Sequence, residues 1–91
     1  MSVSTGQQEF SAILQHAMTS HEVGVRETAR RANLQPAQVS RVLTGKRRAT
    51  PRIVVRLAAA LGASPNEWLA AAGHSWRVPA DATTAELLIF P

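Results

Sequence analysis

The chain contains 91 residues, with ten lysines and arginines, six acidic residues, 45% hydrophobic residues and no cysteine. These values predict one small globular domain and exclude a disulfide framework or a thiolate metal site. No apolar stretch approaches the roughly 18 residues that a membrane span needs, and the first ten residues lack the regions of a secretory signal, so a cytoplasmic protein is expected.

The basic side chains are concentrated in the middle third of the chain. Nine of the ten lie between Gly24 and Arg56, where Glu27 is the single acid, so this segment carries a charge of +8 and the remainder −4. This distribution indicates one surface that faces a polyanion such as nucleic acid. The alternative is an arginine-rich surface that is merely solvated.

A first helix is predicted over residues 7–20, with a capping box formed by Thr5 and Gln8 at its start. Its apolar residues recur at i, i+3, i+4, i+7 and i+8, which places them on one face of a helix. These residues are Phe10, Ile13, Leu14, Ala17 and Met18.

Two shorter helices are predicted next, over residues 25–32 and 36–44. Gly24 is expected to cap the first, and Asn33 to turn the chain in the left-handed conformation. Pro36 opens the second helix at a position where its missing N–H costs nothing. Neither helix is long enough to fold alone, so the rest of the chain has to support the pair.

The basic loop Lys46-Arg47-Arg48 leads to two further helices. One is predicted over residues 51–61, capped by Thr50, and the other over residues 65–72. The second of these begins with a capping box in which Ser64 pairs with Glu67. Together with the preceding helices they predict an all-α fold.

The last eighteen residues allow several structures. Pro79 interrupts the chain, and the apolar run 87–90 is too short to form a domain. The segment can form a short helix from about Thr84, a strand, or an arm that docks elsewhere. Trp76 either packs over the fifth helix or lies in a subunit interface.

The two short helices form a helix-turn-helix, and their surroundings resemble the lambda-repressor-like family, also called the Xre or Cro family. The matching features are Ala29 in RETARRA, Leu34, Val39, the segment VSRVLTGK and the segment RLAAALGASPNEWLAAAG. The resemblance covers the five helices. It implies a compact five-helix DNA-binding domain over residues 1–73, followed by a C-terminal extension over residues 74–91.

The resemblance carries the family's DNA contacts over to particular residues. The base-reading positions fall at the start and on the exposed face of the third helix, at Gln35, Pro36, Ala37, Gln38 and Arg41. Gln38 is expected to pair with adenine, Arg41 with guanine, and Ala37 to touch a thymine methyl group. Phosphate contacts are expected from Arg26, Arg30, Ser40, Lys46, Arg47 and Arg48.

Other side chains have a structural interpretation beside the functional one. Arg30 and Arg31 suit the C-terminal end of their helix, where positive charge complements the helix dipole, and phosphate contact is the alternative. Arg52 and Arg56 lie one turn apart on the fourth helix and are expected to be solvated. Trp68 is expected in the core.

No catalytic constellation is present in the sequence. The acids are scattered, the serines lack a paired histidine, and there is no glycine-rich phosphate loop. His16, His21 and His74 are not spaced to hold a metal ion, because residues five apart lie on different faces of a helix. We therefore expect a protein without enzymatic activity, metal or cofactor.

The resemblance implies a sequence-specific transcriptional regulator of bacterial or phage origin, associated with the nucleoid. We expect a repressor that binds a two-fold operator in double-stranded DNA as a homodimer. The candidate dimer surface lies in the extension, at Trp76, Leu87, Leu88, Ile89 and Phe90. Two alternatives remain: an antitoxin or antagonist that binds a protein partner through this extension, and an architectural protein that binds DNA without sequence preference.

Overall fold

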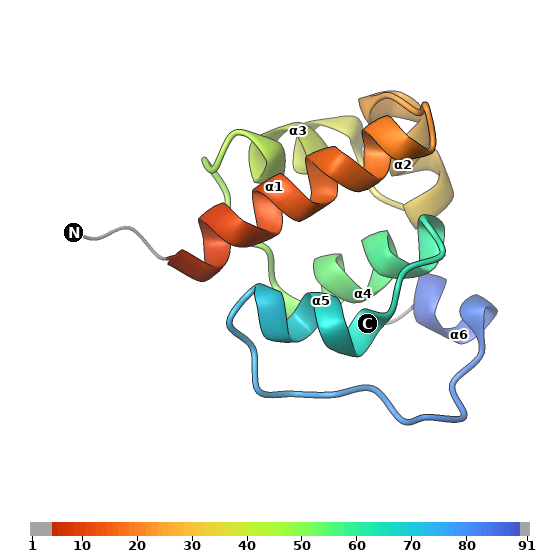
Figure 1. Ribbon diagram of the computed structural model, residues 1–91. Helices are drawn as coiled ribbons and strands as arrows, with labels where there is room; N and C mark the ends of the chain where they lie inside the picture. Colours follow the sequence, from red (N-terminus) through yellow and green to blue (C-terminus); the bar gives the residue numbers. More distant parts are fainter. Residues whose placement is uncertain (1–4, 90–91) are drawn as a thin grey trace.

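The computed structural model of the chain describes residues 5–89, and this part of the chain is built from six α-helices without a strand (Figure 1). The helices are α1 (Thr5–Ser20), α2 (Val25–Ala32), α3 (Pro36–Leu43), α4 (Pro51–Ala60), α5 (Pro65–Ala71) and α6 (Thr84–Leu88). The all-α prediction is confirmed, and the first five helices agree with the predicted ranges to within two residues. The capping box expected of Thr5 and Gln8 lies outside the residues whose side chains are described.

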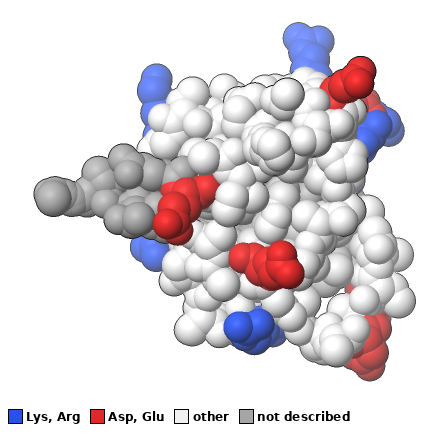
Figure 2. Space-filling model, in the orientation of Figure 1, with Lys and Arg blue, Asp and Glu red and all other residues white. Residues whose placement is uncertain are grey.

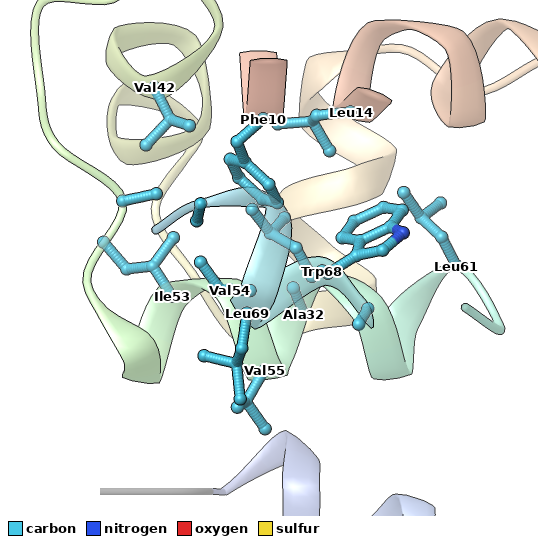
Figure 3. Close-up of a cluster of buried hydrophobic side chains, with 14 of the residues drawn as sticks. Phe10, Leu14, Ala32, Val42, Ile53, Val54, Val55, Leu61, Trp68 and Leu69 are labelled. Atoms are coloured by element: carbon cyan, nitrogen blue, oxygen red, sulfur yellow. The ribbon is translucent and has the colours of Figure 1, made fainter. Parts of the chain in front are cut away.

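The helices form two layers around one core. In Figure 1, α1 lies with α2 and α3 in the upper layer, α4 and α5 lie below them, and α6 lies beside α4. The shared core draws side chains from each of the first five helices, among them Phe10, Leu14, Val42 and Ile53 (Figure 3). Trp68 is buried, as predicted, and meets Phe10 edge-to-face with 5.5 Å between ring centroids. Such pairs contribute about 0.5–1.5 kcal/mol beyond the area they bury.

The turn between α2 and α3 is formed by Asn33, which adopts the predicted left-handed conformation with φ 60° and ψ 41°. The N–H of Leu34 then donates to the carbonyl of Ala29 at 2.9 Å, which satisfies one of the last carbonyls of α2. The carbonyl of Asn33 itself accepts a hydrogen bond from Nη1 of Arg56 at 3.0 Å. The turn is therefore tied to α4.

Arg56 is buried, and the expectation that it is solvated was wrong. Only 9% of the residue is exposed, because α4 packs against α2 at this point and the guanidinium reaches the turn between α2 and α3. Burial lowers the pKa of Arg56 by disfavouring its charged form, and the positive charge of Arg52 lowers it further. Arg56 is thus a structural support of the helix-turn-helix.

The C-terminal extension folds back onto the domain. The side-chain amide of Asn66 binds the backbone of Val78 in both directions, accepting from its N–H at 2.8 Å and donating to its carbonyl at 3.3 Å. A capping box between Thr83 and Glu86 then starts α6, which is the short helix foreseen among the alternatives for this segment. The expected five-helix architecture is extended by one helix.

Helix α6 covers a face of α4 that the other helices leave open. The side chain of Val55 points from α4 toward α6 (Figure 3), and Val55 is fully buried. Leu87 of α6 is buried as well, whereas Ile89, just beyond the helix, is 67% exposed. One side chain of the apolar run thus completes the core, while a neighbour faces solvent.

Leu87 should contribute more to stability than Ile89. Replacing Leu87 by alanine leaves a cavity over α4 and should lower the free energy of unfolding by about 2–4 kcal/mol. The matched variant Ile89→Ala removes a side chain of similar size from the surface and should change that free energy by less than about 0.5 kcal/mol. Urea unfolding of both variants, followed by circular dichroism, tests this. Equal losses would contradict the docking of α6 on α4.

Candidate nucleic-acid interface

Helix α3 is held by one face and presents the opposite face to solvent. Val39 and Val42 are fully buried, and the hydroxyl of Ser11 on α1 donates to the carbonyl of Val42 at 2.9 Å. Most of the predicted DNA-contacting residues on this helix are exposed, namely Gln35, Pro36, Ala37, Ser40 and Arg41. The structure therefore brings these residues together on one accessible surface.

The N-terminal end of α3 is capped by the side chains of two glutamines, Gln35 and Gln38. The backbone N–H of Gln35, the N-cap residue, donates to Oε1 of Gln38 at 2.9 Å, within a capping box. Gln38 is only half exposed. A bidentate contact with adenine uses both the oxygen and the nitrogen of a glutamine amide, so Gln38 has to use the second lone pair of Oε1 for such a contact while the capping bond is in place. Sequence reasoning missed this capping role.

The basic loop after α3 is anchored at both ends. The N–H groups of Lys46 and Arg47 both donate to the carbonyl of Arg41, at 2.9 and 3.1 Å. Ala49 is buried, and its carbonyl lies 2.7 Å from Nε2 of His74. Between these anchors the side chains of residues 46 and 48 are exposed and that of Arg47 is half-buried. The loop therefore presents its positive charge from a fixed backbone.

Helix α2 carries an ion-pair cluster that partly neutralises its arginines. Arg30 donates from Nε to Glu27 at 3.0 Å and from Nη2 to the second carboxylate oxygen, and Nε of Arg31 donates to that oxygen at 2.8 Å. The hydrogen bonds from Arg30, and next those from Arg31, lower the pKa of Glu27 to about 2. The i,i+3 and i,i+4 spacing of these residues is the sequence signal for the cluster. Arg26, the other predicted phosphate contact on α2, is exposed.

Charge is unevenly distributed over the surface. Figure 2 shows that the face bearing α1 and α5 is mostly uncharged, with several acidic side chains on it and basic side chains mainly toward its edges. The predicted DNA-contacting arginines and lysines come instead from α2, α3 and the loop that follows α3. The basic side chains of the predicted interface are thus concentrated on other elements than α1 and α5.

The predicted dimer or partner residues do not form one exposed set. Trp76 is 43% exposed and Ile89 is 67% exposed, whereas Leu87 is buried and Leu88 is half-buried. Phe90 lies outside the described residues. Among the described members of this set, Trp76 and Ile89 therefore present the most surface.

The described part of the chain contains no group of three or more histidine and acidic side chains arranged to hold a metal ion. Within the same residues, no helix combines the length and the apolar character needed to cross a membrane.

A protein-family model described as a helix-turn-helix domain matches residues 9–71, which include most of α1 and all of α2 to α5. The chain belongs to the helix-turn-helix domain family. An Escherichia coli K12 protein named as an uncharacterized HTH-type transcriptional regulator, YddM, is 39% identical over 57 residues. This alignment covers 63% of the present chain and 61% of YddM, so the chain spans about three-fifths of that relative. No solved structure matches.

The Glu27 cluster should limit how strongly α2 contributes to DNA binding. Glu27→Gln removes the charge that holds Arg30 and Arg31, so this variant should bind duplex DNA more strongly. The slope of log affinity against log salt concentration should become steeper by up to about 0.9, the value of one phosphate contact. Because the pKa of Glu27 is about 2, the carboxylate is ionised throughout pH 5–8, and the effect should be equal at both ends of that range. Fluorescence anisotropy with a labelled duplex measures it.

The control for this variant is Glu67→Gln, which makes the same change of charge on α5, away from α2 and α3. Equal effects of the two substitutions would show that only net charge matters. In that case Glu27 would not restrain the arginines of α2.

Proposed function

We propose that this protein is a DNA-binding transcriptional regulator that recognises sequence through α3. The observation that carries the proposal is the pairing of α2 and α3 across the Asn33 turn, with the outer face of α3 exposed and basic residues on both sides. Membership of the helix-turn-helix domain family and the printed name of YddM support it. The features that resemble lambda-repressor-like proteins favour that subfamily.

In the proposed complex, α3 enters the major groove with its N-terminal end leading. Arg41 donates two hydrogen bonds to guanine, and Ala37 contacts a thymine methyl group. Each good bidentate contact discriminates against the wrong base by roughly 1–3 kcal/mol. Gln35 and Pro36 lie at the N-terminal end of α3, which enters the groove first. The side chain of Gln38 accepts a hydrogen bond from the N–H of Gln35 there.

Phosphate contacts fix the position of α3 in the groove. The proposed residues come from α2, α3 and the basic loop: Arg26, Arg30, Ser40, Lys46, Arg47 and Arg48. Six contacts correspond to a slope of about −5 in a plot of log affinity against log salt concentration. The affinity should therefore fall steeply as salt is added.

The protein acts as a dimer and as a repressor in this proposal. One helix-turn-helix reads only a few base pairs, and a two-fold dimer places two recognition helices about 34 Å apart on one face of the duplex. The partly exposed Trp76 and Ile89 of the extension are the proposed contact points between subunits. A dimer bound over a promoter would block access to it.

A second candidate function is binding of a protein partner through the extension, as in an antitoxin or antagonist. The exposure of Trp76 and Ile89 favours it, since both are large hydrophobic side chains at the surface. The burial of Leu87 leaves a smaller apolar surface for a partner than the sequence alone indicates.

Selection of bound duplexes from a random pool at about 0.15 M salt, where the Debye length is roughly 8 Å, tests the proposed function. We expect an enriched motif with two-fold symmetry and half-sites about 10 base pairs apart. A single enriched half-site would retain sequence recognition and exclude the dimer. The absence of enrichment would reject sequence-specific DNA binding.

Arg41 and Arg48 should separate base reading from phosphate contact. Arg41→Ala should relax the preference at one base position and cost roughly 1–3 kcal/mol on the preferred sequence. Arg48→Ala should weaken all duplexes alike and reduce the salt slope by about 0.9. Affinities for the enriched duplex and its single-base variants distinguish these effects. If both variants behaved alike, α3 would not lie in the groove as proposed.

A further inference from the structure

An open pocket lies where α2, the Asn33 turn, the start of α3 and the start of α4 meet. Its polar lining consists of Arg30 from α2, Asn33 from the turn, Gln35 and Gln38 from α3, and Arg52 from α4. These residues are up to 22 positions apart in the sequence, and the packing of α4 against α2 brings them together. The cavity volume is about 510 Å³, which accommodates a phosphate group with bound water.

The lining is rich in positive charge and contains no acid. Arg30 and Arg52 come from different helices, and the buried guanidinium of Arg56 lies behind the turn, on the carbonyl of Asn33. Arg52 is close enough to Arg56 for its charge to lower the pKa of Arg56. Glu27 pairs with Arg30 and Arg31, whereas Arg52 has no acidic partner within residues 5–89. Arg52 therefore brings a positive charge to the pocket that no carboxylate balances within residues 5–89, whereas the charge of Arg30 is partly balanced by Glu27.

The uncharged groups of the pocket also favour an anion. Oε1 of Gln38 accepts from the N–H of Gln35, so the other end of the same amide, Nε2, is a donor. The pocket further adjoins the N-terminal end of α3, the positive end of its helix dipole. Cations, an amide donor and a helix terminus thus converge on one small volume.

We propose that this pocket binds one backbone phosphate of DNA beside the major groove, with Arg52 as its principal cation. The proposal rests on the proposed function, because the leading end of α3 brings the pocket to the duplex. It assigns a role to Arg52, which the sequence pattern predicts to be solvated. It also gives Gln38 a role in phosphate binding in place of bidentate base reading.

The test compares Arg52→Gln with Arg77→Gln, which removes the same charge from an exposed position in the extension. The affinity of the full chain for a short duplex of mixed sequence is measured over a range of salt concentrations. Arg52→Gln should reduce the salt slope by about 0.9 and weaken binding severalfold at low salt, whereas Arg77→Gln should leave the slope unchanged. Arg52→Lys, which keeps the charge, should retain the slope.

Loss of folding does not account for the expected result. Arg52 lies in the first turn of α4, where positive charge opposes the helix dipole and repels Arg56, so Arg52→Gln should not lower the thermal midpoint. Thermal unfolding of each variant checks this. A lowered midpoint would show that Arg52 stabilises the fold, and a weaker binding of Arg52→Gln would then not support the pocket assignment.

The outcomes separate the pocket from the proposed function. If the unmodified chain binds the duplex and Arg52→Gln behaves like Arg77→Gln, the pocket assignment is wrong and DNA binding stands. If the unmodified chain does not bind the duplex, the proposed function fails and the assignment fails with it. If millimolar inorganic phosphate, at constant ionic strength, raises the thermal midpoint of the unmodified chain but not of Arg52→Gln, while Arg52→Gln leaves the salt slope of DNA binding unchanged, the pocket binds free phosphate instead.

Discussion

The hydrogen bond from Arg56 to the carbonyl of Asn33 is the contact on which the geometry of the candidate interface depends. Two helices of eight residues have no independent stability, so their relative angle has to be fixed from outside. Asn33 supplies the left-handed turn, and the guanidinium on α4 holds that turn against the core. A hydrogen bond to a charged group is worth about 1.5–3 kcal/mol when its partner is buried. Together with the burial of Val39 and Val42, Arg56 thus helps to set the orientation of α3 without needing to touch DNA.

The capping signals explain how much of the fold follows from the sequence. Asn33, Pro36 and the Ser64 N-cap each act within one turn of chain, so they predict helix ends without knowledge of packing. At α5 the hydroxyl of Ser64 accepts from the N–H of Glu67, which is one half of the predicted capping box. The sixth helix was only one of three alternatives, since five residues carry too little periodicity to identify a helix. Its position over Val55 depends on a face of α4 that becomes visible only once the other helices are packed.

The candidate site was less predictable than the fold, for two physical reasons. Arg52 and Arg56 look alike in the sequence, one helical turn apart, and only tertiary packing decides that one is buried against the turn while the other lines a pocket. Gln38 lies on the recognition helix, where a glutamine suggests base reading. Its capping role went unnoticed because Gln35 is not among the residues usually found at an N-cap. The exposed face of α3 was predictable, since it follows from the burial of Val39 and Val42 alone.

In the proposed complex, α3 and the basic groups around it form the DNA-binding surface. Backbone amide chemical shifts of the ¹⁵N-labelled chain, recorded while a duplex from the selection is added, test it most directly. The largest changes should fall between Gln35 and Arg52, with α6 nearly unchanged. Changes centred on Trp76 and α6, with α3 unaffected, would contradict it and place the interacting surface in the C-terminal extension.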